Sequence, residues 1–198
     1  MMSKAEKTRE FIIQKSAPIF NIKGYENTSL TDIQEATKLT KGAIYGNFLD
    51  KNELAIAAFQ YNTSLIFNRI SKIINSTSSS AEALIGYGDY YSQKWQGVFK
   101  VGGCPMLNAA VEADDNLFFL REYVRRSFKN FIELLTATIE KGQTNGEFKK
   151  EVNAEEYAAL IHSIVEGNIL LSKIMNEPKY LHLAAARIRH IVEQELKA

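Results

Sequence analysis

Residues 28–48 read TSLTDIQEATKLTKGAIYGNF, a segment with the pattern of two short helices joined by a tight turn. Thr28 or Ser29 can cap the first helix, because a hydroxyl at this position accepts a hydrogen bond from a free backbone amide. Thr40 can cap the second helix in the same way, and that helix is expected to cover about two turns, residues 41–48. Two short helices in this arrangement indicate a helix-turn-helix unit.

Helical signals continue on both sides of this segment. A capping box formed by Ser3 and Glu6 predicts a first helix that ends near Gly24. Further helices are expected at about residues 52–75, 81–96, 105–113, 115–143, 154–176 and 179–197. The sequence therefore predicts an all-α protein of about nine helices. A three-helix domain at residues 1–50 precedes a larger helical domain at residues 51–198.

The composition is that of an ordinary globular protein, with 45% hydrophobic and 24% charged residues in a chain of 198. The 24 basic and 23 acidic residues leave a net charge of +1, so any basic surface must be local. The single cysteine, Cys104, excludes an intramolecular disulfide framework and a CxxC zinc site.

Targeting signals and catalytic motifs are not found in the sequence. The longest uncharged segment, residues 54–68, contains several Asn, Gln, Ser and Thr residues, which argues against a membrane-spanning helix. The opening MMSKAEKTRE lacks the apolar core of a signal peptide. P-loop, GxGxxG and GxSxG motifs are absent, and His162 with Glu166 is too small a set for a metal site. We expect a cytoplasmic protein that is not an enzyme, holds no metal or cofactor, and contacts no membrane.

The starts of the predicted helices suit contact with DNA phosphates. Helices that begin near Thr28, Thr40 and Lys51 direct free amides and the positive end of the helix dipole outward. Eight basic and six acidic side chains over residues 1–52 leave a local charge of +2. DNA affinity would therefore depend on the placement of individual groups and on dimerisation rather than on overall charge.

The second helix of the unit offers side chains for the DNA groove. In a helix-turn-helix unit this helix lies in the major groove, and its amino-terminal side chains meet the base edges. Thr40 and Lys41 can hydrogen-bond to phosphates or base acceptors, and Gly42 lets the backbone approach the duplex. Tyr45 and Asn47 are expected on the exposed face, within reach of phosphate oxygens.

The segment from Phe20 to Leu54 resembles the DNA-binding domain of the tetracycline-repressor (TetR) family. The matching residues are Phe20, Gly24, Tyr25, Thr28–Ile33, Ala36, Leu39–Tyr45, Phe48, Lys51 and Leu54. The phosphate contacts that the resemblance implies are Thr28, Lys41, Tyr45, Asn47 and Lys51. The residues that it places against bases are Thr40, Ala43 and Gly46.

Three residues depart from the family's pattern, which often has an aromatic residue or histidine at the positions of Gly46 and Asn47. The family usually has glycine in the turn where this chain has Lys38. A left-handed backbone there would cost a non-glycine residue about 1 kcal/mol, which a phosphate contact by Lys38 would offset. The alternative is a turn of slightly different conformation. Gly46 weakens the second helix by about 1 kcal/mol relative to alanine. We therefore expect a mobile reading helix before DNA binds.

By the same resemblance, the carboxy-terminal domain binds a small-molecule effector, which requires an apolar cavity with a few polar groups. The residues expected to line it are Trp95, Phe99, Met106, Asn108, Glu112, Phe128, His162 and Glu166. The alternative for each aromatic residue is ordinary core packing, which is the commoner role of aromatic stripes at helical spacing.

Cys104 follows two glycines and precedes Pro105, a residue suited to the first turn of a helix. A thiol at a helix amino terminus loses its proton more readily, and the resemblance includes relatives that sense oxidants through a cysteine. Cys104 is therefore a candidate redox residue. The alternative is a small buried hydrophobe, which is favoured because no second cysteine could resolve an oxidised thiol.

The last two predicted helices carry apolar stripes that suit a homodimer interface. The candidate contacts are Leu160, Ile164, Asn168, Leu181, Ala185, Ile188 and Val192. Two helices from each protomer could form a four-helix bundle. The alternative is that these stripes pack only within one chain.

Together these patterns predict a one-component, ligand-responsive transcriptional regulator, a repressor that binds a palindromic double-stranded DNA operator as a homodimer. Three alternatives stay open at this point. One is a small-ligand-binding helical protein whose DNA-binding head is vestigial. The second is a thiol-based sensor that acts through Cys104. The third is a helical enzyme with Cys104 as its nucleophile, for which the sequence offers no neighbouring base.

Overall fold

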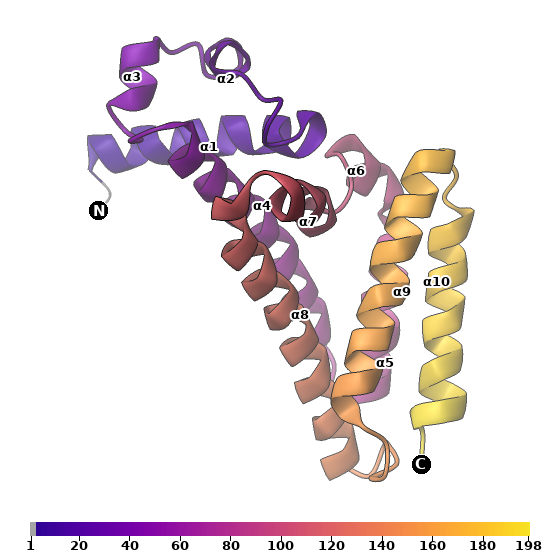
Figure 1. The fold of residues 1–198 in the computed structure, drawn as a ribbon. Coiled ribbons are helices and arrows are strands. Elements are labelled where there is room, and N and C mark those ends of the chain that lie inside the picture. Colours follow the sequence, from indigo (N-terminus) through magenta and orange to yellow (C-terminus); the bar gives the residue numbers. More distant parts are fainter. Residues whose placement is uncertain (1–2) are drawn as a thin grey trace. The chain divides into compact units, whose positions relative to one another are not determined.

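A computed structural model describes residues 3–198, and all of its regular elements are helices (Figure 1). They are α1 (Lys4–Lys23), α2 (Leu30–Thr37), α3 (Lys41–Tyr45), α4 (Lys51–Ile74), α5 (Ser80–Gln93), α6 (Trp95–Lys100), α7 (Pro105–Asp115), α8 (Phe118–Thr144), α9 (Ala154–Met175), α10 (Lys179–His190) and a short π-helical segment (Ile191–Leu196). The predicted all-α fold is confirmed. Residues 1 and 2, which begin the segment found above to lack the apolar core of a signal peptide, lie outside the described residues.

The described residues contain one α-helix more than the sequence predicts. A single helix was expected over residues 81–96, whereas the chain breaks at Lys94 and continues as the separate helix α6. Lys94 has φ −108° and ψ 18°, a conformation that ends α5 and starts α6. This break changes which side chains of residues 95–100 share a face.

The chain forms two compact units. The first contains the residues up to Leu65 together with 105–127, and the second contains 66–104 together with 128–198. Helices α4 and α8 each pass from one unit into the other. The helix-turn-helix segment lies wholly in the first unit. Compactness therefore divides the chain differently from the functional boundary expected at residue 50.

The core of the first unit holds α1, α2 and α3 together. Phe20, Ile33, Ile44 and Phe48 are buried, and the ring of Tyr25 stacks on Phe20 with centroids 5.5 Å apart. Two predicted caps are confirmed. Ser3 and Glu6 form a capping box at α1, and Ser29 and Asp32 form one at α2.

The turn between α2 and α3 has the left-handed backbone expected at Lys38, with φ 59° and ψ 26°. Replacing Lys38 with glycine should therefore stabilise the protein by about 0.5–1 kcal/mol, because glycine adopts this backbone without a Cβ clash. For a chain of this length we expect the Tm to rise by about 2–4 °C per kcal/mol. Lys38→Ala removes the same charge but keeps the Cβ atom, so equal Tm values for the two variants would contradict the prediction.

In the second unit, α10 packs against both α5 and α9 (Figure 1). Leu181, Ile188 and Val192 are fully buried in this packing, and Ala185 is 8% exposed. The prediction that these four residues contact a second protomer was wrong, because their side chains fill the core of their own unit. Helical periodicity identified the buried face of α10 correctly but did not indicate which molecule covers it.

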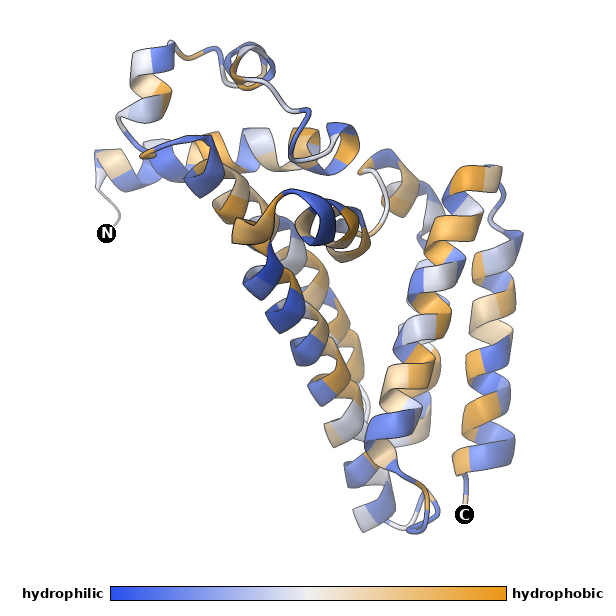
Figure 2. Cartoon of the chain, in the orientation of Figure 1, coloured by the Kyte–Doolittle hydropathy of each residue, from blue (hydrophilic) through white to orange (hydrophobic). Residues whose placement is uncertain are grey.

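Helix α9 is apolar on two faces (Figure 2). One face is buried within the unit, through residues such as Ile161, Val165 and Ile169. The other face is exposed, with Leu160 45% and Ile174 73% accessible. As a result, α9 is the one helix among residues 3–198 whose length and composition would allow it to cross a membrane, although the structure buries 39% of the segment concerned.

Candidate DNA-binding surface and ligand cavity

The amino-terminal end of α3 is exposed. Thr40 caps this helix, and its hydroxyl accepts a hydrogen bond from the Ala43 amide at 3.3 Å. Thr40, Lys41 and Gly42 are all solvent-exposed, and no atom lies within 4 Å of where a Cβ on Gly42 would be. Exposed Lys38 lies in the turn just before them. The structure thus brings four of the predicted DNA contacts together at one helix end.

Helix α3 is shorter than predicted and ends at Tyr45 instead of Phe48. The Asn47 side-chain amide donates to the Ala43 carbonyl at 2.9 Å, which satisfies a carbonyl left free at the helix end. The ammonium group of Lys41 lies 6.0 Å from the centroid of the Tyr45 ring. Ala43, Tyr45 and Asn47 are half-buried, so they present less of their surface than the residues at the amino-terminal end.

Arg9 is a structural residue of this surface that the sequence analysis missed. Its guanidinium lies 4.1 Å from the centroid of the Phe48 ring and donates to the Asn47 carbonyl. It also forms an ion pair with Glu53 at 2.8 Å. Arg9 therefore ties α1 to the end of α3 and the start of α4. Its partners are 38 and 44 positions away, so local sequence patterns carry no signal for them.

Two predicted phosphate contacts have other roles. Thr28 is fully buried, and its hydroxyl donates to the Gly24 carbonyl at 2.6 Å. Its prediction as a phosphate contact was wrong, because the hydroxyl is enclosed by the loop between α1 and α2. Half-buried Lys51 donates to the Glu26 carbonyl at 2.6 Å, and burial lowers the pKa of its ammonium group. Lys51 therefore supports the same loop.

Two residues of α7 also hold this loop and the end of α1. The carboxylate of Glu112 accepts hydrogen bonds from the backbone amides of Tyr25 and Glu26, at 2.9 and 2.8 Å. The side-chain amide of Asn108 donates to the backbone and side-chain oxygens of Asn21, at 3.1 and 3.0 Å. Both residues were expected to line an effector cavity. In the structure their polar groups instead bind the end of α1 and the loop before α2.

Met106, also on α7, is 1% exposed and belongs to the core of the first unit.

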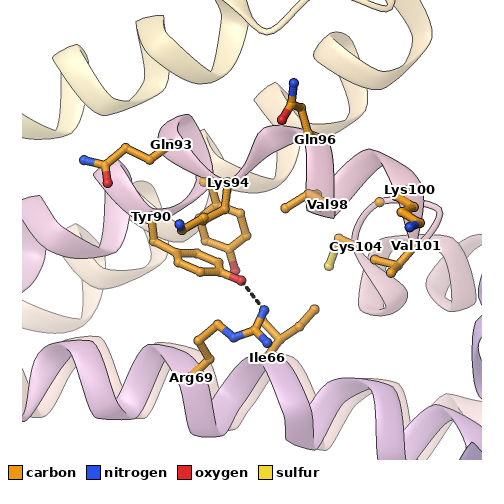
Figure 3. A pocket seen from close by; sticks show the side chains of 13 residues that line it. Ile66, Arg69, Tyr90, Gln93, Lys94, Gln96, Val98, Lys100, Val101 and Cys104 are labelled. Atoms are coloured by element: carbon orange, nitrogen blue, oxygen red, sulfur yellow. Dashed lines mark hydrogen bonds between the residues drawn. The ribbon is translucent and has the colours of Figure 1, made fainter.

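A cavity of about 650 Å³ lies in the second unit (Figure 3). Its walls come from the carboxy-terminal half of α4, the end of α5, α6 and the residues Val101, Gly103 and Cys104. None of the eight residues predicted to bind the effector lines this cavity. Their neighbours in the sequence do: Lys94 and Gln96 flank Trp95, and Val98 and Lys100 flank Phe99. The break at Lys94, where α5 ends and α6 begins, was not part of the predicted helix over 81–96.

A buried polar cluster lies on α9 and its neighbours. The hydroxyl of Tyr87 is 2.7 Å from Nδ1 of His162, and Nε2 of His162 is 3.9 Å from a carboxyl oxygen of Glu166. The Cys104 thiol donates to the same oxygen at 3.2 Å. The rings of Phe128 and His162 have centroids 5.8 Å apart. The predicted residues Phe128, His162 and Glu166 are thus neighbours in the fold.

Burial controls the protonation of this cluster. It raises the pKa of Glu166 to about 7 and lowers the pKa of His162 to about 4. Nε2 of His162 and Oε2 of Glu166 are buried without a hydrogen-bond partner in the described structure. Among residues 3–198, no group of three or more His, Cys, Asp or Glu side chains could hold a metal ion.

Cys104 is 4% exposed and lies directly before the first residue of α7. A thiolate there would lose the hydrogen bond to Glu166 and would face that carboxyl group. The structural setting thus matches the buried-hydrophobe alternative, and a redox role for Cys104 stays a prediction.

Comparison with known proteins agrees with this architecture. Residues 12–58 match the family described as "Bacterial regulatory proteins, tetR family", and residues 82–188 match "Tetracyclin repressor-like, C-terminal domain". The chain belongs to the TetR family of transcriptional regulators. The amino-terminal match contains α2, α3 and the turn between them, which is the predicted helix-turn-helix unit.

Relatives of this TetR-family regulator match over nearly their whole length. The "Uncharacterized HTH-type transcriptional regulator YxaF" of Bacillus subtilis (strain 168) is 26% identical over 189 residues, which are 95% of this chain and 96% of that protein. The crystal structure of a TetR-family regulator from Cytophaga hutchinsonii is 35% identical and has a TM-score of 0.94, with 100% of this chain and 98% of that chain covered. A cysteine mutant of the regulator CifR, complexed with 26 bp double-strand operator DNA, shares the fold at 17% identity and a TM-score of 0.83, with 91% and 94% covered.

The contacts of Glu112 give a testable role in this TetR-family regulator. In Glu112→Ala, the amides of Tyr25 and Glu26 lose their shared acceptor, and we expect the first unit to lose about 1–3 kcal/mol of stability. Hydrogen exchange at these two amides should accelerate, and DNA affinity should fall because the loop before α2 is loosened.

Asp114→Ala provides the control on the same helix. Asp114 is an exposed carboxylate that pairs with Arg121 at 3.3 Å, and such surface pairs contribute about 1 kcal/mol or less. Equal effects of the two substitutions on exchange at residues 25 and 26 would show that the Glu112 contacts do not hold the loop.

Proposed function

We propose that this TetR-family regulator is a repressor that binds a palindromic operator as a homodimer and releases it when a small molecule binds. The observation that carries the proposal is the exposed amino-terminal end of α3, with Thr40, Lys41 and Gly42 in position to enter a major groove. CifR, which has the same fold, is bound to operator DNA in its structure. A protein with this role acts in the cytoplasm, where bacterial DNA lies.

An exposed apolar stripe on α9 supports the homodimer. Leu160, Ile164, Gly167, Leu171 and Ile174 repeat at intervals of three and four residues, the spacing that packs one helix against another. Every member is exposed or half-buried in the single chain.

Helix α10, which packs against α9, also carries an exposed apolar residue, with Leu183 62% accessible. Of the predicted dimer contacts, Leu160, Ile164 and Asn168 lie on the exposed side of α9, so α9 contributes most of the proposed interface. Two such protomers would place their α3 helices in successive major grooves, about 34 Å apart.

The connection between cavity and reading head supports the response to a ligand. Val101, Gly103 and Cys104 line the cavity, and the chain leads from them directly into α7. Asn108 and Glu112 of α7 hold the end of α1 and the loop before α2. A small molecule that binds one arrangement of these segments more tightly would shift the dimer toward that arrangement. We propose that the arrangement selected by the ligand no longer matches the operator spacing.

Fluorescence anisotropy of labelled DNA tests this function. The DNA would come from the region upstream of this protein's own gene, and the titration would be run at two salt concentrations with scrambled DNA as competitor. We expect binding that survives the competitor and weakens as salt rises. Binding lost equally to scrambled DNA would contradict operator recognition. No binding even at low salt would support a ligand-binding protein whose head no longer reads DNA.

A further inference from the structure

The cavity of the second unit is lined by positive charge. Arg69, Lys94 and Lys100 contribute to its walls, and no Asp or Glu does. Among residues 3–198, none of these three cations forms an ion pair with a carboxylate. The net charge of the whole chain is only +1, so three unpaired cations around one cavity are a local feature. An anionic ligand would compensate them.

Arg69 is oriented for recognition of an acid group. Its guanidinium lies beside the Tyr90 hydroxyl at the wall of the cavity, and one guanidinium nitrogen donates a hydrogen bond to that hydroxyl at 2.8 Å (Figure 3). The guanidinium carbon also lies 5.9 Å from the centroid of the Tyr90 ring. These contacts hold the planar group in place and leave most of its five N–H donors available. A guanidinium held in this way suits a carboxylate or sulfonate, which it can bind through two parallel hydrogen bonds.

The rest of the cavity suits an apolar body. Ile66, Val98 and Val101 line it together with the rings of Tyr90 and Tyr91, whose centroids lie 5.0 Å apart. Its volume of about 650 Å³ falls within the range of about 300–1,000 Å³ typical of small-molecule sites.

We propose that the effector is an organic anion, with an aromatic or other apolar body packed on Tyr91 and Val98 and an acid group bound by Arg69. Tyr90 positions the guanidinium, and Lys94 and Lys100 add to the attraction of the anion. This inference rests on the proposed function in one respect, the assignment of the cavity as the effector site.

A matched pair of probes tests the anion requirement without DNA. 1-Anilinonaphthalene-8-sulfonate and N-phenyl-1-naphthylamine share their aromatic rings, but only the first carries an acid group. Trp95, the single tryptophan of the chain, lies between the cavity-lining residues Lys94 and Gln96. Energy transfer from Trp95 is strongest for a probe in this cavity, and its dependence on the Arg69 variants described below separates cavity binding from binding at the apolar stripe of α9. We expect the sulfonate to bind at least about tenfold more tightly than the amine.

Variants at Arg69 separate recognition of the acid from recognition of the rings. Arg69→Gln should weaken sulfonate binding by about tenfold or more and leave amine binding within about twofold. Arg69→Lys, which keeps the charge but not the planar group, should fall between. Lys72→Gln is the matched control, because Lys72 is an exposed cation on the same helix that does not line the cavity. 2-Naphthoate should displace the sulfonate better than 2-naphthamide, which extends the preference to carboxylates.

Three outcomes would overturn the inference: equal binding of the two probes by the unmodified protein, equal loss of both probes in Arg69→Gln, or equal displacement by the acid and the amide. DNA release is measured separately by anisotropy. Arg69-dependent anion binding without DNA release would uphold the ligand class and reject the ligand-responsive function. Release of DNA by uncharged compounds alone would uphold the ligand-responsive function and reject the anionic ligand class.

Discussion

Replacing Glu166 with glutamine is expected to stabilise the protein increasingly as the pH rises from 4 to 8. Burial raises the folded-state pKa of this carboxyl to about 7 from its usual 4.5. Below pH 4.5 the side chain is protonated in both the folded and unfolded states, so it opposes folding little. Between pH 4.5 and 7 the carboxyl is ionised in the unfolded state but still protonated in the folded state. Folding therefore requires uptake of a proton, and the free energy of unfolding decreases as the pH rises. Above pH 7 the folded state carries the buried charge.

The full difference between Glu166→Gln and the unmodified protein is on the order of 3 kcal/mol above pH 7. Urea unfolding at pH 4, 6 and 8, at one protein concentration, measures it as the change in unfolding free energy between the two proteins. A constant offset across this range would mean that Glu166 titrates alike in the folded and unfolded states.

His162 provides the opposite signature in the same cluster. Its pKa is lowered to about 4 from 6.5. The contribution of His162 to the free energy of unfolding is therefore fully present above pH 6.5 and is lost as the pH falls toward 4. His162→Gln should therefore gain stability relative to the unmodified protein at low pH, whereas Glu166→Gln gains it at high pH. In the unmodified protein the two contributions largely cancel between pH 4.5 and 7, so each becomes visible only when the other residue is replaced.

Local chemistry explains how much of the fold could be predicted. The caps at Ser3 and Thr40 act within three residues and were predicted correctly, and Ser29 is the one of two candidate residues that caps α2. The left-handed turn at Lys38 was suggested by the glycine that the family usually has at this position, not by a local pattern of this chain. The break at Lys94 was not predicted, because no glycine or proline marks it.

The sites were less predictable because they depend on long-range contacts. Glu112 binds amides 86 and 87 positions away in the sequence, and the residue pattern of α7 does not indicate that these amides are its partners. Arg69 reaches the cavity from α4, and that cavity exists only once α4, α5 and α6 have packed. In contrast, His162 and Glu166 lie four residues apart on one helix face, and their proximity could be predicted from spacing alone.

Replacing Gly167 with arginine is expected to abolish tight operator binding without unfolding the chain. Gly167 is exposed at the centre of the α9 stripe, and within its own chain no atom lies within 4 Å of where its Cβ would be. The substitution therefore meets nothing in the same protomer, and it raises helix propensity by close to 1 kcal/mol. In the proposed homodimer, the two arginines would enter the space that the opposing helices share and would carry like charges into it.

The monomer would hold only one reading head, so operator affinity should fall by about 10²–10⁴ when the second contact is no longer intramolecular. Sedimentation or light scattering would report the change to a monomer, circular dichroism would show that the helices persist, and anisotropy would report the affinity. Asn130→Arg is the matched control, because Asn130 is an exposed residue of α8 that lies neither in the α9 stripe nor in the cavity wall. A Gly167→Arg protein that stays dimeric would place the dimer contact away from this stripe, and full operator affinity in a monomer would contradict recognition by paired heads.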